Sequence, residues 1–243
     1  MTTSIHLDPG LDPRQLAPVL AQFGRLHLPG VFDPGSAVAI AQALAAPQVP
    51  WIKTWRTLGA SLDGSLEAFD SLTPENRAAF DAEMKAAARG GFCFLFDAWR
   101  VSKDIEAGQR RGGALEPIEA VYDFLNSETF LTFIRRITGE TREIFCDAMA
   151  SRYRPGDFLA AHDDAVSGQR RLWAYVLNFT PGWRADWGGV LNFLDEDGHV
   201  AEGYSPVFNA LNLFSIPTPH AVSYVAPYAP SPRLSITGWV RAR

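Results

Sequence analysis

Two histidines and an aspartate in the second half of the chain could together bind a metal ion. His162 and Asp164 lie in "AAHDDAV", and His220 lies far downstream in "PTPHAVSYVA". Residues i and i+2 of a β-strand project from the same face, so we expect His162 and Asp164 to point together into a barrel while Asp163 points away. The third ligand, His220, begins a later strand that a jelly roll could bring alongside.

The metal itself follows from the type of ligand. Two imidazoles and one carboxylate on one side of a metal leave coordination positions open opposite them, which is typical of non-heme Fe(II) sites that activate oxygen. Zinc could also occupy such a site. The residues alone therefore leave both metals open.

A second pair of residues at strand spacing points to an anion. Arg233 and Ser235 lie in "RLSITGW", thirteen residues after His220 (233 minus 220). A guanidinium matches a carboxylate with two parallel hydrogen bonds, and a neighbouring hydroxyl adds another donor. We expect this pair to hold the far end of a dicarboxylate co-substrate, with Leu234 and Ile236 on the opposite face beneath the helices.

The elements that position these residues change in type near residue 140. Before it, capping residues and apolar spacing predict helices from Asp33 and Pro34 onward, over 73–91 with Thr73 as N-cap, and over 116–127 and 127–139. A strand is predicted over 24–32. The apolar face of the last helix is predicted to lie in the core; its residues are Phe130, Phe133, Ile134 and Ile137.

After Gly139 the apolar period becomes two. Seven short apolar runs separated by turn residues predict strands, and they are "EIFCDAMASRY", "DFLAAH", "RLWAYVLNF", "GGVLNFLDE", "VFNALNLFSI", "PHAVSYVA" and "RLSITGWVRA". So many short strands in about 100 residues indicate a sandwich or barrel.

We therefore predict an α+β fold in which a double-stranded β-helix, or jelly-roll, barrel carries N-terminal helices packed on one sheet. No flexible linker separates the parts, so 1–243 is expected to form a single domain, with 1–140 as a helix-rich support and 141–243 as the catalytic core. Two polar segments, 51–64 and 100–117, are predicted to act as lids over the site.

Composition excludes several other classes of protein. The net charge of −5 gives no general positive field for nucleic acid or anionic membranes, so neither is expected as a partner. No stretch approaches the length of a membrane-spanning helix, and the N-terminus lacks a basic segment followed by an apolar run, which predicts a cytoplasmic location. Cys93 and Cys146 are isolated, and buried thiols are expected.

With these motifs in order, residues 152–239 resemble the Fe(II)- and 2-oxoglutarate-dependent oxygenase superfamily, prolyl hydroxylase group. The segments that carry the resemblance are "RYRPGDFLAAHDD", "GGVLNFL", "LNLF", "PHAV" and "RLSITGW". Within the group, "HDD" followed by "RR" and the closing "RLSITGW" are similar to the branch that hydroxylates a proline of a ribosomal protein. The eukaryotic members of that branch carry a second oxygenase-like domain, for which this chain is too short.

The resemblance assigns a role to each matching residue. It implies that His162, Asp164 and His220 bind iron, and that Arg233 and Ser235 take the C5 carboxylate of 2-oxoglutarate.

Further positions follow from the same resemblance. Tyr153 matches a tyrosine that lines the co-substrate pocket, although it could equally be barrel core. Asn178 stands where many prolyl hydroxylases have a tyrosine, and its amide could still donate a hydrogen bond. Arg171 and Trp183 match positions near the substrate, with a solvated charge and packing on the barrel rim as the respective alternatives.

The implied reagents are Fe(II), 2-oxoglutarate as co-substrate and O2, with ascorbate as an optional reductant. The implied reaction is hydroxylation of a C–H bond, foremost in a prolyl residue of a protein or peptide. Two alternatives remain open, namely the same chemistry on a small molecule such as a free amino acid, and a jelly-roll module that keeps a metal without catalysis.

Overall fold

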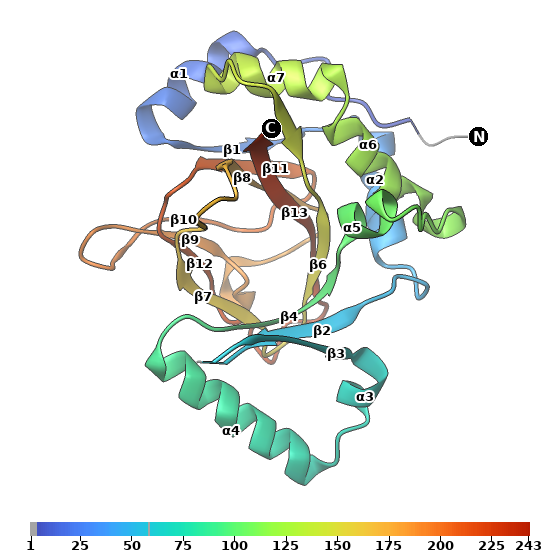
Figure 1. The fold of residues 1–243 in the computed structure, drawn as a ribbon, viewed down its shortest axis with the longest axis vertical. Coiled ribbons are helices and arrows are strands. Elements are labelled where there is room, and N and C mark those ends of the chain that lie inside the picture. Colours follow the sequence, from blue (N-terminus) through green and yellow to red (C-terminus); the bar gives the residue numbers. More distant parts are fainter. Residues whose placement is uncertain (1–3, 58) are drawn as a thin grey trace.

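A nearly closed antiparallel β-barrel forms the centre of the protein (Figure 1). The structure is a computed structural model that describes residues 4–57 and 59–243. Within them one thirteen-stranded sheet follows the path β1-β11-β8-β13-β6-β4-β7-β12-β9-β10. An ion pair between Arg25 of β1 and Glu202 of β10 links the two edge strands of this path. The predicted α+β class with a jelly-roll barrel is confirmed.

The strands are short except for the last one. They are β1 (Arg25–Pro29), β2 (Ile52–Arg56), β3 (Ser61–Ser65), β4 (Phe94–Trp99), β5 (Ile144–Cys146), β6 (Met149–Tyr153), β7 (Phe158–His162), β8 (Arg171–Asn178), β9 (Leu191–Leu194), β10 (Val200–Tyr204), β11 (Ala210–Ser215), β12 (His220–Val222) and β13 (Arg233–Ala242).

Seven helices surround the barrel in the described residues. They are α1 (Pro13–Phe23), α2 (Pro34–Leu44), α3 (Leu66–Asp70), α4 (Pro74–Gly90), α5 (Val101–Glu106), α6 (Glu116–Leu125) and α7 (Glu128–Thr138). The predicted caps are present: the side chains of Asp33, Thr73 and Ser127 accept hydrogen bonds from the first turns of α2, α4 and α7. Gly139 ends α7 with φ 71°.

Most of the helices cover one side of the barrel. Helices α1 and α7 lie across one end in Figure 1, and α2, α5 and α6 lie beside β6 and β13. The predicted inner face of α7 is buried, as are both cysteines and the outward-facing Leu234 and Ile236 of β13, which join the same apolar cluster. Helices α3 and α4 stand at the opposite end, below β2, β3 and β4.

The first 140 residues contain more strand than the sequence indicated. The segment 51–64, predicted as a lid, lies mainly in the hairpin of β2 and β3, which pairs with β4 (residue 58 lies outside the described residues). The segment 100–117 is not a plain loop, because α5 and a 3₁₀ turn lie within it with Val101 and Leu115 buried. Helix α1 and strand β10 were not predicted. Pro18 interrupts the helix, and the strand has Ala, Glu and Gly between Val200 and Tyr204, without an apolar alternation.

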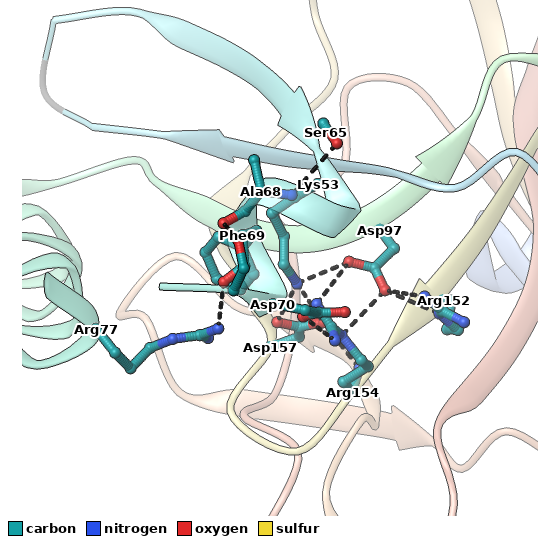
Figure 2. Close-up of polar contacts among 11 residues, drawn as sticks. Lys53, Ser65, Ala68, Phe69, Asp70, Arg77, Asp97, Arg152, Arg154 and Asp157 are labelled. Atoms are coloured by element: carbon teal, nitrogen blue, oxygen red, sulfur yellow. Dashed lines mark hydrogen bonds and ion pairs between the residues drawn. The ribbon is translucent and has the colours of Figure 1, made fainter. Parts of the chain in front are cut away.

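A buried ion network ties the hairpin to the barrel (Figure 2). Lys53 on β2 is 1% exposed and its Nζ lies 2.8 Å from Asp97 of β4 and 2.9 Å from Asp157, which follows β6. Arg152 and Arg154 pair with Asp97 from the other side. Burial raises the pKa of Asp157 to about 6 although Lys53 opposes the shift. The lysine is thus needed to compensate two carboxylates that water does not reach.

None of the helices in the described residues is both long enough and apolar enough to cross a lipid bilayer.

We predict that Lys53→Met lowers the free energy of unfolding by about 3–5 kcal/mol, because it leaves the buried Asp157 without its cation while Asp97 keeps Arg152 and Arg154. Urea unfolding measures the loss, with Lys103→Met on the exposed side of α5 as the matched control. Adding Asp157→Asn should recover part of the loss. Equal stability of the Lys53 and Lys103 variants would contradict the role of the network.

Candidate metal centre and anion pocket

Antiparallel pairing of two strands brings the predicted metal ligands together. In the register of β7 and β12, His162 lies opposite His220. One ligand atom from each of His162, Asp164 and His220 lies within 4.8 Å of the others. The Asp164 carboxylate faces both rings, with Oδ1 3.3 Å from His162 Nε2 and Oδ2 3.6 Å from His220 Nε2.

Backbone carbonyls fix the orientation of both imidazoles. His162 Nδ1 lies 3.0 Å from the carbonyl oxygen of Ala160, and His220 Nδ1 lies 2.8 Å from that of Thr218. A carbonyl oxygen can only accept, so each Nδ1 carries the proton and each Nε2 presents its lone pair to the common centre. This is the tautomer that a metal ligand requires.

Asp164 does not reach the site by strand geometry. Strand β7 ends at His162, and Asp164 has a left-handed backbone with φ 62°. Aspartate tolerates this conformation better than most residues, and Arg171 Nη1 donates to the Asp164 carbonyl oxygen at 3.1 Å. Asp163 is exposed. The side chains of His162 and Asp164 both point into the site, as expected. The left-handed backbone at Asp164, and not the alternation of a strand, directs the second of them.

The electrostatics favour the protonation states that bind metal. Burial alone would raise the pKa of Asp164, but the adjacent imidazoles of His162 and His220 hold it below its ordinary value. Burial, aided by His162, lowers the pKa of His220 to about 4. At neutral pH the site therefore offers an ionised carboxylate and a neutral His220 ring.

The three residues open into a cavity of about 410 Å³ that reaches Arg233. Arg233 is 2% exposed, and the only hydrogen bond of its guanidinium in the described residues runs from Nη2 to Asn178 Oδ1 at 3.3 Å. Nε and Nη1 of Arg233 and Nδ2 of Asn178 have no partner there. A buried guanidinium with no carboxylate beside it is costly unless an anion joins it. The cavity thus combines a metal-binding end with an anion-binding end.

Other predicted site residues lie at different depths. Tyr153 lines the cavity, with the Arg233 guanidinium 5.3 Å above its ring and Phe96 stacked on it. Ser235 is fully buried, and its Oγ lies 2.8 Å from Ser151 Oγ rather than in the cavity lining. The Ser235 hydroxyl therefore does not line the space that an anion would fill.

Only one of the two residues predicted to lie near the substrate lines the cavity. Arg171 lines the cavity, and its guanidinium lies 3.5 Å above the ring of Trp239. Trp183 is not among the lining residues: it packs edge-on against Trp187, and its Nε1 donates to the carbonyl oxygen of Gly188. The structure therefore brings Arg171, and not Trp183, to the site.

Sequence reasoning missed several residues of the cavity wall. Thr54 and Ser61 come from the β2–β3 hairpin, and Phe92 places its ring 5.1 Å from that of His162. Trp239 closes another side. The alternation in "FCFLF" could have indicated an inward-facing strand at β4, but nothing local indicated that the strand would border the metal ligands.

Comparisons with known proteins agree with this geometry. Residues 148–241 match the 2OG-Fe(II) oxygenase superfamily. The chain is 32% identical over 131 residues to prolyl 3-hydroxylase OGFOD1 of Mus musculus, which corresponds to 51% of this chain and 24% of the mouse protein. The match thus spans about a quarter of the length of that relative.

Two solved structures share the whole fold. A prolyl-4-hydroxylase of Pseudomonas putida aligns with a TM-score of 0.59 and 19% identity over 100% of this chain and 97% of its own. A prolyl hydroxylase of Trichoplax adhaerens, solved with a peptide fragment of the hypoxia inducible factor oxygen degradation domain, aligns with a TM-score of 0.62 and 15% identity over 95% and 89% of the two chains.

The barrel and the facing His, Asp and His side chains have the arrangement of a non-heme iron site. Residues 148–241, the part of the chain that carries this site, match the 2OG-Fe(II) oxygenase superfamily, which is the family that the motifs indicated. That family uses Fe(II), 2-oxoglutarate and O2, and the donor set and the two unpartnered nitrogens of Arg233 fit the first two.

We predict that His162→Ala and Asp164→Ala each weaken Fe(II) binding more than about 100-fold, because each removes one of three ligands. The affinity is measured under nitrogen by competition with a chromogenic chelator. Asp163→Ala is the matched control, since it removes a neighbouring exposed carboxylate. A loss of affinity in the Asp163 variant equal to that in the Asp164 variant would refute the ligand set.

Proposed function

We propose that the chain is an Fe(II)- and 2-oxoglutarate-dependent dioxygenase that hydroxylates a prolyl residue of a protein or peptide. The observation that carries this proposal is the buried guanidinium of Arg233, which has two unpaired nitrogens in the same 410 Å³ cavity as the His162, Asp164 and His220 cluster. A metal site alone would not require such a cation, whereas a metal site that works with a dicarboxylate would.

Each protein group has a defined task in this proposal. His162, Asp164 and His220 hold Fe(II) from one side, and Arg233 holds the distal carboxylate of 2-oxoglutarate through its free nitrogens. Asn178, at the position where many relatives have a tyrosine, is fully buried outside the cavity lining, and its Oδ1 orients the guanidinium by accepting from Arg233 Nη2. When bound, Fe(II), 2-oxoglutarate and O2 supply the oxidant that hydroxylates the C–H bond.

The remaining walls orient the reactants and exclude water. Tyr153 lies under the Arg233 guanidinium, while the Ser235 hydroxyl pairs with Ser151 outside the cavity lining. Arg171 and Trp239 lie beside Asp164, where a substrate would enter. The apolar lining protects the oxidant from competing reactions.

The resemblance to prolyl hydroxylases supports a polypeptide substrate. The mouse relative is a prolyl 3-hydroxylase, and the Trichoplax adhaerens protein was solved with a peptide. The same chemistry on a small molecule is the first alternative. A metal-binding module without catalysis is the second, and it is disfavoured because Arg233 would then be a buried charge without a purpose. We also propose that the protein is cytoplasmic and that residues 1–243 form one domain. We expect neither nucleic acid nor a membrane as a partner.

We predict that Arg233→Gln weakens 2-oxoglutarate binding roughly 100-fold, because charged hydrogen bonds of about 1.5–3 kcal/mol each are lost. The visible absorption band of the anaerobic Fe(II) and 2-oxoglutarate complex reports the affinity. The variant without ligand should be at least as stable as the parent, since an uncompensated buried charge is gone. Unchanged affinity would refute the anion pocket.

We expect the chain to convert 2-oxoglutarate to succinate and to add one oxygen atom to a proline of a cellular protein. Mass spectrometry of proteins from cells with and without the enzyme identifies the target, and an Asp164→Ala chain is the inactive control. A gain of oxygen on a small molecule in place of a protein would support the first alternative. Stable metal binding with no succinate formed under any condition would support the second.

A further inference from the structure

A second cavity, of about 700 Å³, lies outside the barrel between α4 and the strands that carry the histidine ligands. Residues of α4 form one wall, and residues of β7 together with the end of β12 form the other. Helix α4 contacts the rest of the protein through Phe80, which packs edge-on against Trp55 and Phe69. Of its residues only Met84 and Ala87 are buried. The rest of the helix therefore leaves an open cleft beside the barrel.

The floor of this cleft is electrically neutral. Lys53, Arg154 and Asp157 line it, and they belong to the ion network of Figure 2, in which three cations meet three carboxylates. The pairs join Lys53, Arg152 and Arg154 to Asp70, Asp97 and Asp157. None of these charges is left over to bind a ligand.

The helix wall, in contrast, carries excess positive charge. Arg77, Asp81 and Lys85 share one face of α4 at intervals of four residues and line the cleft. Arg77 Nη2 donates to the Phe69 carbonyl oxygen and its guanidinium lies 3.9 Å above the Phe69 ring, as Figure 2 shows in part. Neither Arg77 nor Lys85 forms an ion pair within the described residues. Two cations against one carboxylate favour an acidic occupant.

The opposite wall is largely apolar. Phe158, Leu159 and Val222 contribute to it, together with Tyr224, whose side chain is 57% exposed. Such a wall suits the side chains that lie between the acidic residues of an extended peptide.

Both walls of the cleft continue into the wall of the metal cavity. Leu159 and Val222 line both cavities, and β7 continues from Ala160 in the cleft to His162, a step of about 7 Å. Helix α4 ends at Gly90, and Phe92 then lines the metal cavity. A chain that entered the metal cavity could therefore continue along the cleft, where α4 from Arg77 to Ala88 accommodates roughly five extended residues.

We propose that this cleft is a docking site for an acidic segment of the polypeptide substrate, next to the residue that enters the metal cavity. The inference rests on the proposed function, because it takes the substrate to be a polypeptide. It adds a requirement that the metal cavity does not impose, namely carboxylates within a few residues of the acceptor.

Peptide binding tests this inference without turnover. The probes are fluorescent peptides with a central proline, flanked on both sides by glutamates, glutamines or lysines. Their anisotropy is measured with the full chain in low salt, without iron or 2-oxoglutarate. The glutamate peptide should bind most tightly, and its affinity should fall when the ionic strength is raised to about 1 M.

Charge reversal on the exposed helix face locates the binding. Lys85→Glu should weaken the glutamate peptide roughly fivefold to tenfold, because an attraction becomes a repulsion. Asp81→Asn should tighten it. Arg136→Glu, an exposed residue of α7 at the opposite end of the barrel, is the matched control with the same change of net charge and should leave binding unchanged.

Two outcomes would overturn the docking site: equal binding of the glutamate and lysine peptides, or equal loss in the Lys85 and Arg136 variants. Failure of the proposed function looks different. If the glutamate peptide binds through Lys85 but no succinate forms with any protein, the dioxygenase proposal fails and the docking site stands. If proline is hydroxylated with a KM that Lys85→Glu does not change, the docking site fails alone.

Discussion

The antiparallel pairing of β7 with β12 is the interaction on which the site depends. It sets His162 opposite His220, with ring centroids 4.1 Å apart, although 57 residues separate them along the chain (220 minus 162, less one). A shift of one residue in this register would send one imidazole to the outer face of the sheet. Asp164 then needs only a short turn after β7 to place its carboxylate between the two rings.

The barrel is also what makes a buried arginine useful. In water, Arg233 would attract any anion weakly, but in the barrel its guanidinium is desolvated and two of its nitrogens lack partners. The fold tolerates this cost because Tyr153 and Asn178 partly compensate the charge. The same low dielectric strengthens the hold on a carboxylate that enters the cavity.

The two faces of the same strands have different tasks. On β2, Thr54 lines the metal cavity while Lys53 next to it belongs to the outer ion network. On β4, Phe96 packs on Tyr153 inside, and Asp97 pairs with Lys53 outside. A change in the register of the hairpin would therefore disturb the outer network and the cavity wall together. The network thus links the position of the wall to the floor of the second cleft.

The helix caps and the change of period after Gly139 could be read from the sequence, because they depend on neighbours within a few positions, and the candidate site residues could be recognised by their chemical types. Strand spacing could place Arg233 and Ser235 on one face, but it could not separate Arg171, which reaches the cavity, from Trp183, which packs elsewhere. The folded chain alone reveals that β2, β3 and β4 wall the cavity, that Asp164 has a left-handed backbone after β7 and that α4 stands off the barrel. These features arise from pairings between distant segments, whose free energy depends on burial that no local stretch of residues encodes.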